Sequence, residues 1–235
     1  MARKPLSGAR DKPIRTFGRT GGRPLSPRRQ ALIDTLLPTL AVPADDPGSL
    51  HPETLFDTPG PVWLEIGFGG GEHLVAQARA NPETGFIGCE PFIEGMAKAL
   101  SGVDEFGLRN VRLHMDDARD VLSWLAPNSL ARCFILFPDP WPKKKQRKRR
   151  LIQPDFLSAL HTACAPGAPV RFATDVASYA DEALYHFLTH GGFEWQAEDA
   201  AAWRTPPADH QTTRYEAKRL GDCAPVWFDF VVSAC

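Results

Sequence analysis

The sequence predicts an α/β fold with a mostly parallel sheet of seven strands, helices on both faces and an antiparallel edge. From Val62 onward, short apolar segments alternate with segments of helical length. Parallel neighbours need a crossover connection, usually a helix, so this alternation favours a parallel sheet. Two apolar segments near the C-terminus, residues 193–197 and 226–232, have no predicted helix between them, which favours an antiparallel edge. The 235 residues suffice for one sizeable domain with tails.

Seven segments are predicted as strands because short apolar runs dominate them. In order, they are Val62–Ile66, Gly85–Cys89, Val111–Met115, Ala131–Phe137, Val170–Ala173, Phe193–Ala197 and Val226–Val232. The last of these places large apolar residues at every second position, as a strand with one buried face does. Helices are predicted over Gly71–Ala80, Phe92–Phe106, a short stretch ending at Leu125, Pro154–Cys164 and Val176–Thr189.

The N-terminal part differs in composition from the rest. Residues 1–58 form a basic extension rich in proline and glycine, and residues 59–235 are predicted as the folded domain. We expect residues 1–24 to be disordered without a partner, because they are polar and contain few apolar residues. A short helix is predicted from Ser26-Pro27 to Leu37, followed by an irregular connection over residues 38–60.

Positive charge is concentrated in two blocks, although the formal net charge is only −1. Of the 27 Lys and Arg residues, nine lie within residues 1–30 and seven within residues 143–150. Residues 1–30 contain one of the 28 acids, so the remainder of the chain is acidic. Such segregation is typical of a protein with a polyanionic partner. Two solvated basic segments without a partner are the alternative.

Several classes of protein do not fit this sequence. The five cysteines are odd in number and form no CxxC pair, which argues against a disulfide framework and a zinc site and favours a reducing, cytoplasmic compartment. The seven histidines form no cluster with metal-ligand spacing, so we expect no metal. No uncharged apolar stretch is long enough to cross a membrane, and the N-terminus has no secretory signal. Its Arg-rich, acid-poor character leaves an organelle transit peptide as an alternative.

A glycine-rich turn, Gly67-Phe68-Gly69-Gly70-Gly71, joins the first predicted strand to the first helix. Glycines there permit a tight turn and close approach of a ligand to the backbone. The dinucleotide motif GxGxxG requires glycine where Glu72 stands, and an acid at a helix start competes with a pyrophosphate for the same amides. Glu65 before the turn suits a cationic or amino-bearing ligand. S-adenosylmethionine (SAM) has a sulfonium, an ammonium and no phosphate, and therefore fits.

Two further acids end the next two strands. Glu90 follows the second strand and is placed to accept hydrogen bonds from two ribose hydroxyls. Asp117 follows the third and is placed to accept one from an adenine amino group. Either acid alone is equally well explained as a solvated cap, but acids at the ends of successive strands favour the cofactor interpretation.

The fourth predicted strand ends in Pro138-Asp139-Pro140-Trp141. This tetrad is a variant of the Asn/Asp-Pro-Pro-aromatic motif of many amino-methylating enzymes. The prolines restrict the backbone and so preorganise the carboxylate. Trp141 is placed to stack on a base or to cap the core, and an Asx turn before proline is the purely structural alternative for Asp139.

Four motifs occur in an order that resembles the bacterial tRNA (guanine-N7-)-methyltransferase family, a Rossmann-like class I methyltransferase family. They are Glu65-Ile66-Gly67-Phe68-Gly69, Pro138-Asp139-Pro140-Trp141 with Lys143, Thr174-Asp175, and Thr213-Arg214-Tyr215-Glu216. The resemblance covers about Trp63 to Val232. Two departures are Pro142, where the family usually has histidine and which could shift Lys143, and Gly70, where methionine is more usual.

The resemblance implies a SAM-dependent transfer of a methyl group to N7 of a guanosine in tRNA, at position 46 of the variable loop. It implies no obligate protein partner. Contacts to SAM would come from Glu65, Gly67, Gly69, Glu90, Asp117 and Asp139, of which Asp139 would also be catalytic. Contacts to the target nucleotide would come from Lys143, Asp175, Thr213, Arg214, Tyr215 and Glu216. The tRNA backbone would be held by Lys145, Gln146, Arg147, Lys148, Arg149 and Arg150.

Three other functions are alternatives for this sequence. An NAD-dependent oxidoreductase is disfavoured by Glu72. A non-catalytic RNA-binding protein on the same scaffold would keep the basic blocks and lack turnover. A SAM enzyme acting on an exocyclic amine, or on another RNA, is disfavoured by Asp139 in place of asparagine and by the C-terminal Thr-Arg-Tyr-Glu motif.

Overall fold

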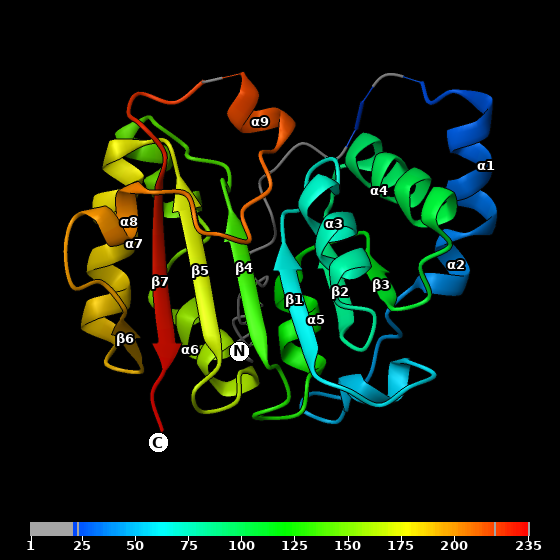
Figure 1. Cartoon of the computed structure of the whole chain (residues 1–235), viewed down its shortest axis with the longest axis horizontal. Helices are drawn as coiled ribbons and strands as arrows, with labels where there is room; N and C mark the ends of the chain where they lie inside the picture. The colour runs from blue at the N-terminus through cyan, green and yellow to red at the C-terminus, as the bar shows by residue number, and fades with distance from the viewer. Residues whose placement is uncertain (1–20, 23, 219, 235) are drawn as a thin grey trace, which may run out of the picture.

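The computed structural model of the chain describes residues 21–22, 24–218 and 220–234 (Figure 1). The expected disorder of residues 1–24 falls largely outside these ranges. The seven predicted strands all form, with ends that differ from the predicted ones by two residues at most. They are β1 (Val62–Ile66), β2 (Gly85–Cys89), β3 (Val111–His114), β4 (Arg132–Leu136), β5 (Pro169–Thr174), β6 (Phe193–Trp195) and β7 (Val226–Val232).

The strands form one sheet in the order β3-β2-β1-β4-β5-β7-β6. Strands β1 to β5 are parallel, and β7 runs antiparallel to both β5 and β6. The predicted fold class is therefore confirmed, including the antiparallel edge. The chain builds the sheet outward from β1 to β3 and then returns to β4 on the other side of β1. In sheets of this kind, ligands bind at the carboxyl ends of the strands where the order reverses.

Helices cover both faces of the sheet (Figure 1). The predicted helices are α3 (Glu72–Ala80), α4 (Ile93–Phe106), α5 (Ala118–Trp124), α6 (Pro154–Ala163) and α7 (Ala177–His190). Side chains of α5, α6 and α7 pack with Leu64 and Ile66 of β1 in one large core. Side chains of α3 and α4 form a second core against the opposite face. Gly107 and Gly191 end α4 and α7 in left-handed conformations, with φ of 59° and 76°.

The N-terminal region packs on the second core. The helix predicted from Ser26-Pro27 to Leu37 forms as α1 (Pro27–Thr35), and it lies along α4. The prediction of an irregular segment over residues 38–60 is wrong in part, because α2 (Leu37–Leu40) and a 3₁₀ helix, η1 (Pro52–Leu55), form there. Leu40 is buried in the core of α3 and α4. Elements of four residues contain too little periodicity to be found in a sequence.

Two more short helices lie between β6 and β7, where no helix was predicted. They are α8 (Ala201–Arg204) and α9 (Arg214–Ala217). The chain between them crosses the face of the sheet opposite to α5, α6 and α7, in front of β4 and β5 in Figure 1. Phe134, Leu136, Ala173 and Trp227 form a small apolar cluster on that face.

Within the described ranges, no helix is long and apolar enough to cross a membrane.

Replacing Phe187 of α7 with alanine should lower the free energy of unfolding by about 3–5 kcal/mol. The ring is fully buried and stacks on Phe230 of β7, with ring centroids 4.0 Å apart. Leu188→Ala, on the same helix but 51% exposed, should change stability by no more than about 0.5 kcal/mol. Urea unfolding of both variants checks this, and equal losses would contradict the assigned core.

Candidate active site

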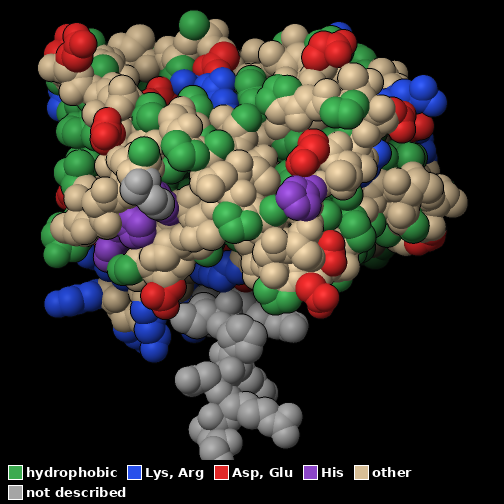
Figure 2. Space-filling model, turned by 90° about the horizontal axis from the view of Figure 1, so that it is seen from below, with side chains coloured by type: hydrophobic (Ala, Val, Ile, Leu, Met, Phe, Trp, Pro, Cys, Tyr) green, Lys and Arg blue, Asp and Glu red, His purple; other side chains and the backbone are tan. Residues whose placement is uncertain are grey.

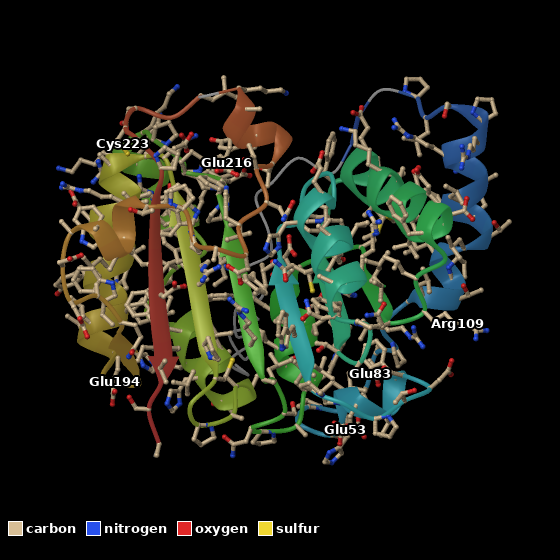
Figure 3. The ribbon with its side chains drawn as sticks, in the orientation of Figure 1. Glu53, Glu83, Arg109, Glu194, Glu216 and Cys223 are labelled. Atoms are coloured by element: carbon tan, nitrogen blue, oxygen red, sulfur yellow. The ribbon has the colours of Figure 1, made fainter. Side chains whose placement is uncertain are left out.

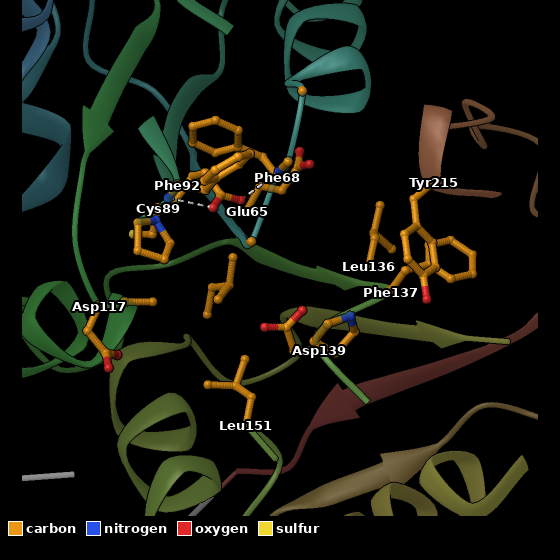
Figure 4. A pocket seen from close by; sticks show the side chains of 18 of the residues that line it. Glu65, Phe68, Cys89, Phe92, Asp117, Leu136, Phe137, Asp139, Leu151 and Tyr215 are labelled. Carbon is orange, nitrogen blue, oxygen red and sulfur yellow. Dashed lines mark hydrogen bonds between the residues drawn. The ribbon is translucent and has the colours of Figure 1, made fainter. Parts of the chain in front are cut away.

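A cavity of about 400 Å³ opens at the carboxyl ends of β1, β2 and β4, where the strand order reverses. The four acids predicted to contact a cofactor all line it: Glu65, Glu90, Asp117 and Asp139. Gly67 and Gly69 line it as well. Figure 4 shows Asp139 between the Asp117 end of the cavity and the rings of Phe137 and Tyr215. The parallel sheet thus gathers acids that are up to 74 residues apart in the sequence.

The glycine-rich turn is held open by left-handed glycines and by Glu90. The φ angles of Gly67, Gly69 and Gly71 are 72°, 56° and 79°, a region that side chains with a Cβ rarely adopt. The Glu90 carboxylate accepts hydrogen bonds from the backbone N–H of Gly69 (2.8 Å) and of Phe92 (2.9 Å). Burial raises the pKa of Glu90; the two amide bonds oppose this rise and the charge of Asp139 adds to it. Glu90 therefore joins the turn after β1 to the end of β2.

Glu65 is paired with a histidine that the sequence did not single out. Its Oε2 lies 2.8 Å from Nδ1 of His73, in the first turn of α3, and both side chains are almost fully buried. The His73 ring also packs edge-on against Phe134 of β4, with centroids 4.7 Å apart. A buried carboxylate needs hydrogen-bond partners, and His73 supplies one. The imidazole therefore fixes the direction in which Glu65 presents its other oxygen.

Asp117 caps α5. Its side chain accepts a hydrogen bond from the backbone N–H of Arg119 (3.0 Å), and the Arg119 guanidinium lies 2.9 Å from Oδ2. Arg119 also lines the cavity. A carboxylate has about four acceptor positions, so these bonds leave room for a further donor.

Asp139 sits on a strained turn. Phe137 and Trp141 both adopt positive φ, 52° and 41°, although neither is a glycine. Such conformations cost about 1–3 kcal/mol each and concentrate at functional sites. Burial raises the pKa of the Asp139 carboxyl. The two prolines and the two left-handed aromatic residues together leave the carboxylate little freedom to turn away from the cavity.

The acceptor end of the cavity is formed by α9 and the residues before it. Thr213 and Tyr215 line the cavity, and the Tyr215 ring lies 5.9 Å from that of Phe137. Thr213 and Glu216 form a reciprocal capping box at the start of α9. Burial raises the pKa of Tyr215, and the charges of Asp175 and Asp139 add to this. Glu216 belongs to α9 and lies at the same end of the sheet as Cys223 (Figure 3).

Three residues predicted to contact the nucleotide lie outside the lining of the cavity. Asp175 is 4% exposed, and its carboxylate accepts a hydrogen bond from the N–H of Gly221 (2.9 Å). Glu216 is held by His210, whose Nε2 lies 2.9 Å from Oε1. Lys143 is exposed just before the 3₁₀ helix η2 (Lys144–Arg149). The Arg214 side chain is outside the described part of the chain. Their contacts with a nucleotide stay predictions.

The residues of the basic run divide into exposed and half-buried ones. Lys144, Lys145 and Lys148 are exposed on η2, whereas Gln146, Arg147 and Arg149 are half-buried. The Arg149 guanidinium lies over the Trp141 ring, 5.0 Å from its centroid, and lines the cavity. The face at the other end of the molecule, seen in Figure 2, has acidic side chains scattered singly over its surface, with Lys and Arg side chains among and beside them.

The prediction that Arg150 holds the RNA backbone is wrong, because its side chain is fully buried. Its guanidinium donates to the carbonyl of Pro140 (2.8 Å), to the carbonyl and hydroxyl of Ser178 (2.7 and 2.8 Å) and to Glu182 (2.8 Å). It also lies over the Tyr179 ring. Arg150 therefore anchors the turn that carries Asp139 to α7. Only burial distinguishes it from the cations beside it, and a charge run in a sequence does not reveal burial.

Sequence reasoning missed His73, Arg119 and Phe137. His73 follows the glycine-rich turn by two residues and precedes Gln77 by one helical turn, which is a weak signal for a buried polar pair. Arg119 stands two residues after its partner Asp117.

Within the described ranges, no group of three or more His, Cys, Asp and Glu side chains is arranged to hold a metal ion.

The sequence of this chain is similar to those of known methyltransferases. Residues 59–227 match the family described as "Putative methyltransferase". The chain is 58% identical over 217 residues to the tRNA (guanine-N(7)-)-methyltransferase of Hyphomonas neptunium, covering 92% of this chain and 99% of that protein. It is 54% identical over 218 residues to the enzyme of the same name from Caulobacter vibrioides strain NA1000, covering 93% and 95%.

The solved structure of the 16S rRNA methyltransferase KamB shares the fold. Its TM-score is 0.53 at 16% sequence identity, over 77% of this chain and 91% of that chain.

Replacing Arg150 with methionine should lower the free energy of unfolding by about 3–5 kcal/mol, because Glu182 and two carbonyls lose a buried donor. Lys148→Met, at an exposed position of the same run, should change it by about 0.5 kcal/mol or less. Denaturant unfolding measures both values. A similar, small effect of the two substitutions would show that Arg150 is not an anchor.

Proposed function

Because the chain belongs to the tRNA (guanine-N(7)-)-methyltransferase family, we propose that it transfers a methyl group from SAM to N7 of a guanosine in tRNA, forming 7-methylguanosine. The observation that carries the proposal is one cavity that gathers the glycine-rich turn, Asp139 and the rings of Phe137 and Tyr215. One side of that cavity suits the methyl donor and the other a planar base. By the family resemblance, the target is the guanosine at position 46 of the variable loop.

The residues of the cavity fit SAM. Its volume of about 400 Å³ is within the range of small-molecule sites. Four acids complement a ligand with a sulfonium and an ammonium, and Glu72 at the start of α3 disfavours a phosphate-bearing one. Phe68, Phe92, Leu136 and Leu151 supply the apolar lining that an adenine ring requires. When bound, SAM supplies an electrophilic methyl group on a positively charged sulfur.

Each acid has a proposed task that follows from its position. Glu90, already fixed by two backbone amides, accepts from the ribose hydroxyls. Asp117 accepts from the adenine amino group. Glu65, oriented by His73, takes the ammonium. A cationic ligand favours ionised carboxylates and so opposes the effect of burial on the pKa values of Glu90 and Asp139.

The acceptor atom makes few chemical demands on the protein. N7 of guanine carries an in-plane lone pair and loses no proton when it is methylated, so a general base is not required. The rate then depends on placing N7, the methyl carbon and sulfur in line. We assign Asp139 to this orientation, and Asp175 or Glu216 to the guanine N1 and N2 donors. Phe137 and Tyr215 provide ring faces on which the base can stack.

The basic run beside the cavity suits the tRNA backbone. Lys144, Lys145 and Lys148 are exposed on η2, and η2 follows the Asp139 turn directly. Arg149 lines the cavity, and we assign its guanidinium to a phosphate flanking the target nucleoside. We propose that residues 59–235 form the catalytic domain, and that the basic extension of residues 1–58 adds contacts to tRNA. Such a substrate implies a cytoplasmic protein.

The decisive experiment is methyl transfer from labelled SAM to unmodified bulk tRNA, with nucleoside analysis of the product. Asp139→Ala should lower kcat/KM about 10- to 150-fold, the equivalent of one charged hydrogen bond of about 1.5–3 kcal/mol. Asp155→Ala, an exposed acid of α6, should leave it within about twofold.

Label in another nucleoside, or in tRNA whose guanosines are replaced by 7-deazaguanosine, would reject N7 chemistry in favour of an amine acceptor. No transfer at all, with SAM binding intact, would favour a binding protein. Wild-type turnover of Asp139→Ala would remove Asp139 from the mechanism.

Gly95→Ala should weaken SAM binding about tenfold or more. A Cβ at Gly95 on α4 would lie 2.3 Å from the carbonyl oxygen of Gly69, so the glycine-rich turn must move. At Gly102→Ala, on the same helix, the nearest atoms to the new Cβ belong to the Val75 side chain, at 2.9 Å, and not to the glycine-rich turn; affinity should change by about twofold at most. Both variants replace a glycine of α4 with alanine, a better helix former. Calorimetric titration with SAM compares them; equal affinities would mean that the turn does not set the cofactor site.

Changing Lys144, Lys145 and Lys148 together to alanine should make the slope of log affinity for tRNA against log salt shallower by roughly 2, since each phosphate contact contributes about 0.7–0.9. Arg109→Ala, an exposed cation at the other end of the molecule (Figure 3), should leave the slope unchanged. Filter binding between low and moderate salt measures both. A slope that does not respond to the triple substitution would exclude these lysines from the tRNA interface.

A further inference from the structure

Three charged side chains lie side by side on the sheet face that the chain between α8 and α9 crosses. Arg132 is on β4, Arg171 on β5 and Asp229 on β7. Arg171 and Asp229 are direct cross-strand partners, and the guanidinium of Arg171 donates to both carboxylate oxygens, at 2.6 and 3.0 Å. Arg132 lies over the rings of Trp63 and Phe134. The sheet by itself therefore presents a buried cation, Arg171, a half-buried one, Arg132, and one anion.

Asp209, from the crossing segment, supplies the second anion. Its two carboxylate oxygens accept from Nη2 of Arg132 (2.7 Å) and from Nη1 of Arg171 (2.5 Å). Burial tends to raise the pKa of Asp209, but the hydrogen bonds and charges of Arg171 and Arg132 lower it overall. With Asp209 in place, the four side chains are balanced in charge. Without it, two arginines that are 10% and 18% exposed would share one carboxylate.

The backbone of Asp209 is tied to the cofactor side of the site. Its carbonyl accepts a hydrogen bond from the Gln77 side chain of α3 (2.9 Å). The same Gln77 nitrogen lies 3.4 Å from Nε2 of His73, and His73 pairs with Glu65 in the cavity. A continuous polar path therefore runs from the cavity wall, through α3, to Asp209.

The residues that follow Asp209 are those of the acceptor end. His210 pairs with Glu216 (2.9 Å) and packs on Trp227. Glu216 closes the capping box with Thr213, and Thr213 and Tyr215 line the cavity. Three residues separate Asp209 from Thr213, so a shift of Asp209 cannot be absorbed over a long connection.

We propose that Asp209 is a positioning residue, a latch that holds the segment of residues 205–218 on the charged sheet face and so places Thr213 and Tyr215 for the acceptor guanosine. This inference rests on the proposed function, because it assigns that segment to the acceptor. The latch acts through the segment and touches neither the donor nor the base. Its loss should therefore affect tRNA and not SAM.

The test compares Asp209→Asn with Glu198→Gln in the full chain. The asparagine keeps the shape of Asp209 but removes the charge that both arginines require. Glu198 is an exposed acid on the same β6–β7 connection, so its variant has the same change in net charge. Three quantities are measured: amide hydrogen exchange of residues 205–218, the dissociation constant for SAM, and kcat and KM for unmodified tRNA.

For Asp209→Asn we expect exchange of residues 205–218 about tenfold faster than in the wild type and KM for tRNA about tenfold higher, with SAM affinity within about twofold. Glu198→Gln should match the wild type in all three. Unchanged exchange overturns the latch. Faster exchange with an unchanged KM for tRNA overturns the role of Asp209 in placing the acceptor. A loss of SAM affinity as large as the rise in KM for tRNA overturns that role as well.

Two further measurements keep the test decisive. Should Asp209→Asn fail to fold, Gln77→Leu removes the bond to the Asp209 carbonyl, together with the longer contacts of Gln77 with His73 and Asn81, both 3.4 Å. It should speed exchange of residues 205–218 and raise KM for tRNA by about two- to threefold; unchanged values would overturn the proposal. If the wild-type protein makes no 7-methylguanosine, the proposed function fails. The exchange measurement on the ligand-free protein then still decides whether Asp209 holds the segment.

Discussion

The parallel pairing of β1 with β4 is the constraint on which the rest of this structure depends. The chain extends the sheet from β1 to β3 and then returns to the other side of β1, so the loops after β1 and β4 diverge to opposite faces and leave a cavity between them. That geometry brings Glu65 and Asp139 to one space. The glycine-rich turn and the Pro-Asp-Pro turn are useful only because this pairing sets them opposite each other.

Burial then decides whether a charged side chain is fixed by partners within the protein or stays in solvent. Glu65, Glu90 and Asp117 are all less than a tenth exposed, and each is held by a histidine, by backbone amides or by an arginine. Acids fixed in this way are available to a cationic ligand without reorganisation. The same principle divides the basic run after β4. Its lysines stay in water, whereas Arg150 is buried, as suits a planar guanidinium that can satisfy several acceptors at once.

Arg150 and the strained turn that carries Asp139 act together. Phe137 and Trp141 are held at positive φ on either side of Asp139, and that conformation requires support from its surroundings. Arg150 supplies support through the Pro140 carbonyl, and the Phe137 N–H donates to the carbonyl of Ala173 on β5 (2.8 Å). On the acceptor side, the Asp209 cluster performs a comparable task for a segment that has no long helix of its own. Rigid placement is what the proposed reaction, which needs no general base, requires of a protein.

The sequence by itself determined the seven strands, the five main helices, the glycine-rich turn and the acids at the strand ends, because these depend on local patterns of apolar residues and on turn chemistry. It did not determine that β7 lies between β5 and β6, nor the short helices α8 and α9, which depend on packing between distant segments. Only the tertiary structure paired Glu65 with His73, buried Arg150 and placed Asp209 between Arg132 and Arg171. Burial and partner choice for a charged side chain are properties of the folded surface around it, and residue type and spacing do not encode them locally.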